Sequence, residues 1–402
     1  MSIIMFVREA EFVNINIEFF DEEPMENLIT CMNFKMDKVI FFGHSDIMTP
    51  ERIKATQKSL RNICGITNAE FFEVSQKNLY KIVELMEREI KKEVHAGGKC
   101  FFDLTGGEDL VLVAMGILST QHKVPMHKFD LRSEELYLLN KWDDVPRIDE
   151  VVTVRDLQLT LDDVIGLYGG VINYRQQKEV KSHLTDMEFE QDVKRMWEVA
   201  RQNPRKWNAL SSVLKSCIKY EGTDLSVSMQ ADALVKIAKR TPDMTSIKEI
   251  RKYLHQLAEA GILDGLRADT QFVGFMYKSE LIRDCLLDAG CLLELHTYYE
   301  RKQTGKYSDC RVGVHIDWDG IIHGYEVDVE NEIDVMLLEG KNPVFISCKN
   351  GKVNQMALYE LDAVASRFGG KYVKKELAAT QEISQGYRKR AEEMGILIRM
   401  EN

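Results

Sequence analysis

The 402-residue sequence predicts an α/β protein with an open parallel sheet in its N-terminal part and a second α/β domain at its C-terminus. Strand and helix patterns alternate over residues 11–130, which is typical of a parallel sheet of Rossmann type. Farther along, residues 331–349 contain two apolar runs joined by a polar turn at 338–343, which indicates a hairpin. Hydrophobic residues make up 45% of the chain, enough for two or three separate cores.

The N-terminal elements follow from local signals. Each predicted strand is short and rich in apolar residues, and proline or serine stands where several of the helices would begin. The predicted strands cover residues 12–17, 39–42, 69–74 and 100–103; predicted helices follow Pro24, Pro50 and Ser75 and cover 110–118; a hairpin is expected at 127–139 and a domain boundary at 142–146.

The loop after the fourth strand is the candidate ligand site of this sheet. Thr105, Gly106 and Gly107 combine free backbone N–H groups, a hydroxyl and a following helix start, which suits a phosphate group. Ligands of such sheets bind beyond the carboxyl ends of the strands. The loop lacks the G-x-G-x-x-G pattern, so a dinucleotide cofactor is not expected.

The middle of the chain is predicted to be helical, and residues 207–275 resemble a winged helix. Ser246 and Glu249 have the spacing of a capping box. Four basic residues then share the outer face of that helix: Lys248, Arg251, Lys252 and His255. This face either enters a DNA groove or is the solvated surface of a linker.

The C-terminal hairpin carries the most informative chemistry. Asp334 lies in its first strand, and Ser347 and Lys349 share one face of its second strand, because side chains two apart on a strand point the same way. A carboxylate that can hold a divalent ion beside a Lys that can offset phosphate charge is what metal-dependent phosphodiester cleavage needs. Glu332 shares a face with Asp334 and is a weaker candidate.

This hairpin resembles the PD-(D/E)xK nuclease superfamily, with Ser347 in place of the usual acid. The resemblance implies that Glu360, on the next predicted helix, supplies the missing acid and that Glu294, on a preceding apolar helix, is a further site acid. It also implies metal binding by Asp334, Glu294, Glu360 and the carbonyl of Cys348, with Mn²⁺ or Mg²⁺ as the ion, since oxygen-rich sites favour hard cations.

The combination of the Thr105–Gly107 loop with this hairpin resembles the CARF-domain ancillary nucleases of type III CRISPR defence. The resemblance implies a CARF sensor domain (1–145), a linker and winged-helix-like region (146–274) and a nuclease domain (275–402). It implies a homodimer activated by a cyclic oligoadenylate, most often the tetramer, bound by Thr105, Gly106, Gly107, His44 and Ser45. The acidic residues 21–23 either turn outward or contact adenine or ribose.

Charge and composition narrow the function further. The net charge is −11, but residues 1–50 carry nine acids and three bases, whereas residues 341–400 carry eleven bases and six acids. The C-terminal part is therefore the better candidate to bind DNA, and possibly RNA. Eight cysteines without a C-x-x-C pair, no signal peptide and no long apolar run predict a cytoplasmic protein away from membranes.

Two alternatives stay open from the sequence. A ligand-responsive transcription regulator would use the winged-helix-like region and carry an inactive nuclease-like domain, for which Ser347 would be the mark. A nuclease that is always active would need no small activator.

Overall fold

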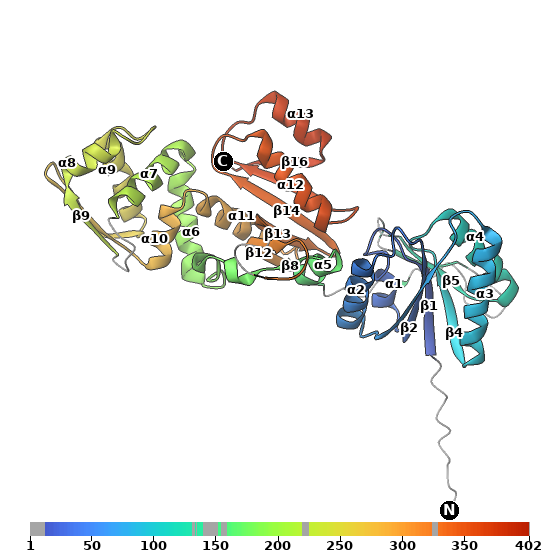
Figure 1. The fold of residues 1–402 in the computed structure, drawn as a ribbon. Helices are drawn as coiled ribbons and strands as arrows, with labels where there is room; N and C mark the ends of the chain where they lie inside the picture. The colour runs from blue at the N-terminus through green and yellow to red at the C-terminus, as the bar shows by residue number, and fades with distance from the viewer. Residues whose placement is uncertain are drawn as a thin grey trace, which may run out of the picture. The chain divides into compact units, whose positions relative to one another are not determined.

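A computed structural model describes residues 13–130, 133, 135–139, 152–153, 159–218, 225–323 and 329–401. The chain divides into two compact units, residues 1–170 and 171–402, each of which is described by itself (Figure 1). The predicted boundary at 142–146 lies outside the described residues. The three-part division expected from the sequence stays a prediction.

Strands and helices alternate along the first unit as the sequence pattern predicts. Thr49 caps the second helix and Asn78, rather than Ser75, caps the third. The elements are β1 (Val13–Phe19), α1 (Ile29–Asn33), β2 (Lys38–Gly43), α2 (Pro50–Ser59), a π-helical turn (Leu60–Cys64), β3 (Asn68–Glu73), α3 (Leu79–His95), β4 (Gly98–Asp103), α4 (Asp109–His122), β5 (Met126–Asp130), β6 (Glu135–Leu138), β7 (Val152–Thr153) and α5 (Leu161–Leu167).

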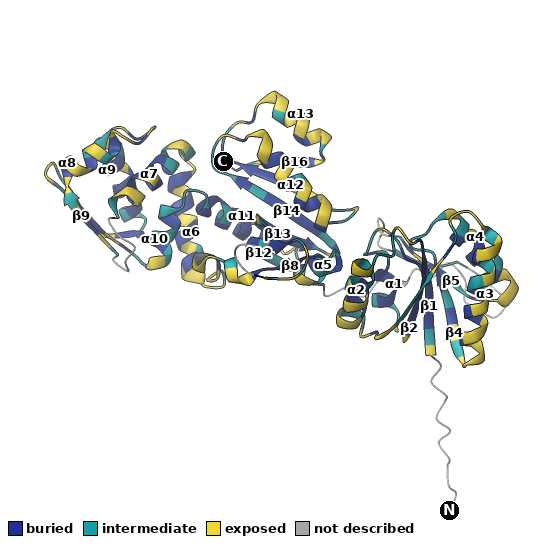
Figure 2. Ribbon diagram, in the orientation of Figure 1, coloured by how far each residue is buried: buried dark blue, intermediate teal, exposed yellow. Residues whose placement is uncertain are grey.

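These strands form one sheet in the order β3-β2-β1-β4-β5-β6-β7. The first five run parallel and the last two add antiparallel, which confirms the predicted open parallel sheet and the predicted hairpin. Helices α3 and α4 cover one face and α1 and α2 lie on the other (Figure 1). The central strands are buried almost throughout (Figure 2). The carboxyl ends of β1, β2 and β4 therefore meet at one edge of the sheet.

The second unit contains two sheets and the remaining helices. Its elements are β8 (Val171–Ile172), two 3₁₀ turns (Tyr174–Gln176 and Glu179–Lys181), α6 (Met187–Ala200), α7 (Pro204–Cys217), β9 (Ser226–Gln230), α8 (Ala231–Ala238), α9 (Ile247–Glu259), β10 (Leu263–Ala268), β11 (Phe272–Tyr277), α10 (Glu280–Leu287), α11 (Cys291–Gln303), β12 (Asp309–Asp317), β13 (Glu330–Glu339), β14 (Asn342–Lys349), α12 (Gln355–Phe368), β15 (Lys374–Ala379), α13 (Gln385–Glu393) and β16 (Ile396–Met400).

The larger sheet of this unit has the order β16-β15-β14-β13-β12-β8. Strands β12, β13 and β14 are antiparallel, and β15 and β16 continue parallel to β14. The predicted hairpin is present, but its turn is tighter than expected: Glu339 pairs with Asn342, and Gly340 takes a left-handed φ of 62°. Helix α11 packs its apolar side chains on this sheet, among them Leu293 and Leu295.

A smaller antiparallel sheet, in the order β10-β11-β9, accompanies α7, α8 and α9. The side chain of Ser246 accepts a hydrogen bond from the amide of Lys248 at the start of α9. The expected reciprocal contact of a capping box is absent there, because Glu249 is paired with Lys206 instead.

Candidate active site and ligand-binding loops

Asp334 lies at the centre of a polar cluster on the β13–β14 hairpin. The hairpin register, continued by one pair beyond Val335 and Ile346, places Ser347 opposite Asp334. Ser347 Oγ donates to Asp334 Oδ2 over 3.2 Å, and the Cys348 amide donates to the same oxygen over 2.6 Å. Lys349 Nζ lies 4.0 Å from it. The three residues expected to face one another therefore do so.

Glu294 approaches the same cluster from the first turn of α11. Burial raises its pKa to about 7, and the charge of Asp334 adds to this while Lys181 opposes it. Burial also raises the pKa of Asp334, against the opposing effect of Lys349. Because two mostly buried carboxylates affect each other in this way, the site favours a bound cation.

Lys181 is the cation that the sequence analysis missed. Its ammonium group lies 2.6 Å from Glu294 Oε2 and 2.8 Å from Glu332 Oε1. Both contacts are short ion pairs; burial acts to lower the pKa of Lys181, but the two carboxylates outweigh it and raise that pKa. Lys181 belongs to a segment without helical or strand periodicity, so only the three-dimensional structure brings it to the site.

Glu360 lies on the helix that follows the hairpin, α12. It is exposed on α12, whereas its neighbours Leu358 and Leu361 are buried. Within the described ranges, no hydrogen bond or ion pair joins Glu360 to Asp334. The Cys348 side chain is buried and contacts Thr297, while its backbone amide holds Asp334.

The side-chain atoms that could bind a metal at this site are carboxylate oxygens, which suit Mg²⁺ or Mn²⁺. The buried carboxylates of Asp334 and Glu294, with raised pKa values, fit such an ion, since it would supply the positive charge that burial demands. In the described part of the chain, the carboxylate oxygens of these two side chains and Glu332 do not all lie within 4.8 Å of one another.

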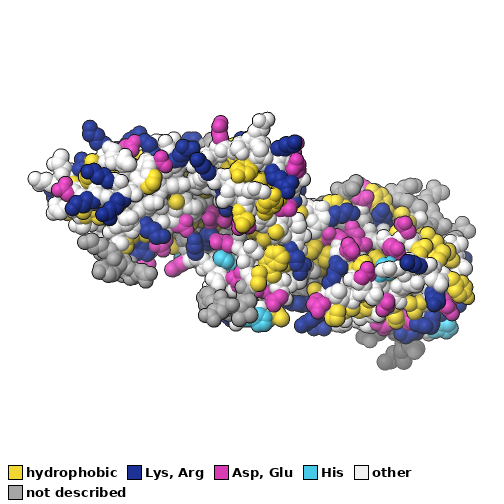
Figure 3. Space-filling view, turned by 45° about the horizontal axis from the view of Figure 1, so that its top comes forward, with side chains coloured by type: hydrophobic (Ala, Val, Ile, Leu, Met, Phe, Trp, Pro, Cys, Tyr) yellow, Lys and Arg dark blue, Asp and Glu magenta, His cyan; other side chains and the backbone are white. Residues whose placement is uncertain are grey.

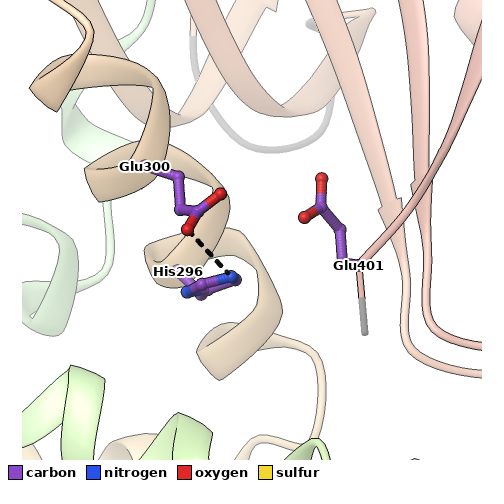
Figure 4. Close-up of side chains that lie close together, drawn as sticks. All are labelled: His296, Glu300 and Glu401. Carbon is purple, nitrogen blue, oxygen red and sulfur yellow. Dashed lines mark ion pairs between the residues drawn. The ribbon is translucent and has the colours of Figure 1, made fainter.

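One group that does meet this criterion lies elsewhere, at His296, Glu300 and Glu401 (Figure 4). His296 stacks on Trp197 with ring centroids 4.1 Å apart, and its Nε2 lies 3.9 Å from Glu300. Arg301 pairs with Glu401 over 3.2 Å. Each member thus has a protein partner, and we regard the group as a structural contact between α11 and the end of β16.

The candidate ligand loop of the first unit is held in place by a buried carboxylate, that of Asp103 at the end of β4. Asp103 Oδ1 accepts a hydrogen bond from the Thr105 amide over 2.8 Å and another from its hydroxyl. Burial acts to raise the pKa of Asp103, but nearby His127 and the bonds from Thr105 and Thr30 outweigh it and lower that pKa. Asp103 therefore stays charged and fixes the loop.

Asp21 turns inward onto this loop. Its Oδ2 accepts a hydrogen bond from the Gly107 amide over 3.1 Å, and its Oδ1 accepts one from the Glu23 amide over 2.9 Å. A Cβ at Gly106 would lie 2.8 Å from Asp21 Oδ2, so glycine permits this approach. Of the alternatives drawn from the sequence, the outward orientation is wrong for Asp21, because the loop amide holds its carboxylate.

His44 and Ser45 follow β2 at the same edge of the sheet. The His44 ring is buried, and its Nε2 lies 3.1 Å from Glu108 Oε2 at the start of α4. Ser45 is exposed. The loops after β1, β2 and β4 thus converge through Asp21, His44 and Thr105, although acids rather than bases surround them.

Surface charge is mixed. On the visible face of the described residues, Lys and Arg side chains are interspersed with Asp and Glu (Figure 3). In the described ranges, no helix is long and apolar enough to cross a membrane.

Comparisons with known proteins now place the fold. No family model matches the sequence, and no curated protein matches it. Among solved structures, protein VC1899 from Vibrio cholerae is similar over 96% of this chain and 93% of its own, with a TM-score of 0.73 and 18% identity. Can2 from Sulfobacillus thermosulfidooxidans, in complex with cyclic tetra-adenylate, is similar over 96% and 95%, with a TM-score of 0.63 and 16% identity. The chain therefore shares the fold of these two proteins, as the predicted resemblance implies.

Proposed function

We propose that this chain is a nuclease that hydrolyses phosphodiester bonds with Mn²⁺ or Mg²⁺ and is activated by a cyclic oligoadenylate. The observation that carries the proposal is the cluster of Asp334, Ser347 and Lys349 with the buried Glu294 beside it. This cluster belongs to a unit joined in one chain to an α/β unit whose glycine loop presents amides at its strand ends. Such a pairing suits a sensor coupled to an effector.

Each residue has a distinct role in this proposal. Asp334, Glu294 and the carbonyl of Cys348 hold the divalent ion, which when bound supplies Lewis acidity at the phosphate. Ser347 keeps Asp334 in orientation through its hydroxyl. Lys349 orients the attacking water or stabilises negative charge on the phosphate. Glu360 joins the ligands only if α12 brings its exposed face to the hairpin, and metal titration of Glu360→Ala tests this role.

The activator is proposed from the loops of the first unit and from the neighbour that holds cyclic tetra-adenylate. The amides of Gly106 and Gly107, the Thr105 hydroxyl, His44 and Ser45 would contact its phosphates and sugars. We further propose a cytoplasmic homodimer whose paired sensor domains share one ring, with DNA and possibly RNA as substrate.

A transcription regulator is the second candidate, and the smaller sheet of the second unit favours it. The order β10-β11-β9 beside three helices is typical of a winged helix. Lys248, Lys252 and His255 are exposed on α9, while Arg251 bonds to the carbonyl of Asp269. Sequence-selective binding of duplex DNA without metal would favour this candidate, and metal-dependent cleavage would favour the nuclease.

The Lys349→Ala variant tests the nuclease. We expect it to lose cleavage of plasmid, single-stranded DNA and RNA by roughly 100-fold or more, while it still binds cyclic tetra-adenylate. Lys352→Ala, an exposed Lys three residues away, is the matched control and should keep the parental rate. Cleavage by Lys349→Ala near the parental rate would refute the proposed role.

A further inference from the structure

Lys181 is unusually placed for a lysine. Its side chain is 1% exposed, and its ammonium group lies between two carboxylates, Glu294 and Glu332. Burying an ammonium ion is costly unless opposite charges surround it, so these acids are what keep Lys181 in place. Glu332 is also 3.9 Å from His315 Nε2, but Lys181 is the nearer cation.

The Lys181 side chain packs closely against a glycine of the sheet. Gly313 of β12 lies between the pairs Val312–Val335 and Val314–Ile333, and therefore opposite Asp334. A Cβ at Gly313 would overlap the Cδ and Nζ atoms of Lys181. The absence of a side chain at Gly313 thus lets the ammonium group reach the carboxylates beside Asp334.

The segment that carries Lys181 begins where the first unit ends. Lys181 lies eleven residues beyond Gly170, the last residue of that unit. Strand β8 and the ion pair between Lys178 and Asp288 (2.8 Å) attach the segment to the second unit. The stretch of chain between the first unit and Lys181 is therefore short.

We infer that Lys181 is an internal cation that competes with the divalent ion for the carboxylates of the active site. The inference rests on the proposed nuclease function and adds its regulation: the activator withdraws the 171–181 segment, and with it Lys181, so that the ion can bind. An ammonium group and a divalent ion on the same carboxylate repel each other, so the ion binds more weakly while Lys181 is retained beside Glu294. By linkage, the activator must then raise the affinity for the ion.

The inference is tested by titration of the full-length protein with Mn²⁺ alone. Electron paramagnetic resonance of the free ion measures how much Mn²⁺ is bound. Without activator, Lys181→Met should bind Mn²⁺ about tenfold or more tightly than the parent, and cyclic tetra-adenylate should add little. In the parent, cyclic tetra-adenylate should tighten Mn²⁺ binding. Lys194→Met, which removes an exposed lysine of α6 outside this segment, should behave like the parent. Unchanged or weaker binding by Lys181→Met would overturn the inference.

Two further measurements keep the test decisive. Should Lys181→Met fail to fold, Lys181→Gln keeps donors for both carboxylates without the charge and carries the same expectation. In the unmodified protein, acetylation of Lys181 measured by mass spectrometry should rise with Mn²⁺ and activator, whereas constant protection overturns the inference. Asp334→Asn distinguishes failure of the proposed active site from failure of the competition by Lys181. If Asp334→Asn binds Mn²⁺ as the parent does, the proposed active site is wrong. If binding depends on Asp334 but not on Lys181, only the proposed competition is wrong.

Discussion

At the scale of single residues, both candidate sites hold internal charges where ligands of the same sign would bind. Lys181 lies among the acids near Asp334, and Asp21 accepts the amide of Gly107 in the ligand loop. Such contacts satisfy buried or aligned polar groups in the free protein. An incoming cation or phosphate must replace them, so its net affinity is lower than its direct contacts alone would give.

Removal of the charge at Asp21 is therefore expected to favour a phosphate-bearing ligand. Asp21→Asn should bind cyclic tetra-adenylate at least about fivefold more tightly, since one like charge near 4 Å costs about 1 kcal/mol even in water. Isothermal titration calorimetry measures this. Asp37→Asn, which alters a carboxylate that also accepts a backbone amide but precedes β2, is the control. Weaker binding by Asp21→Asn would contradict a competing role and indicate that the carboxylate orders the loop.

Glu18 makes stability depend on pH in a defined direction. Its pKa lies well above the ordinary value of 4.5, because it is buried in β1 and lies near Asp103. The folded state therefore holds this proton more tightly than the unfolded state, and stability falls as pH rises from 4.5 toward the folded pKa. The neutral isostere in Glu18→Gln removes this loss.

Calorimetric melting of the full chain checks the sign. Glu18→Gln should match the parent in stability at pH 5 and be more stable than the parent at pH 8. Glu84→Gln, an exposed substitution on α3, should show no such difference. An equal effect of Glu18→Gln at both pH values would contradict the assignment.

At the scale of elements, the sequence predicts those features that local patterns determine. The parallel strands, α2 starting at Pro50 and the β13–β14 hairpin follow from periodicity and from proline and glycine signals. The pairing of Asp334 with Ser347 also follows, because strand alternation and a short turn leave one register. The predicted capping box at Ser246 is incomplete, because the Glu249 side chain pairs with Lys206 instead of the Ser246 amide.

The missed features depend on contacts between segments far apart in the sequence. Lys181 is more than 100 residues from both Glu294 and Glu332, and nothing in its own segment marks it. The sequence places Asp21 only near the loop, and the inward orientation of its side chain depends on the glycine at 106. Glu360, in contrast, lies on the exposed side of α12, as the apolar neighbours Leu358 and Leu361 on the buried side indicate.

The role of Gly313 is testable at this scale. It has a φ of 60°, and a Cβ there would meet Lys181. Gly313→Ala should therefore destabilise the second unit by about 1–3 kcal/mol, through backbone strain and displacement of the buried lysine. Urea unfolding measures the change. Gly351→Ala, at a glycine with open space around it and no positive φ, should stay within about 0.5 kcal/mol of the parent. Equal stability of both variants would show that Gly313 carries no such constraint.

At the scale of the whole molecule, we propose that the two units act as a sensor and an effector in one chain. The fold is shared with Can2 over nearly the full length of both chains. Residues 171–181 link the first unit to Lys181, which pairs with Glu294 and Glu332. In this account, the free protein is held inactive by Lys181 and the activator relieves it.

Relaxation of supercoiled plasmid by the full-length protein tests this account most directly, in four conditions with and without Mn²⁺ and with and without cyclic tetra-adenylate. The account predicts relaxed circles only when both are present. Relaxation with Mn²⁺ alone at the same rate would contradict the sensor, and intact plasmid, single-stranded DNA and RNA in all four conditions would contradict the nuclease.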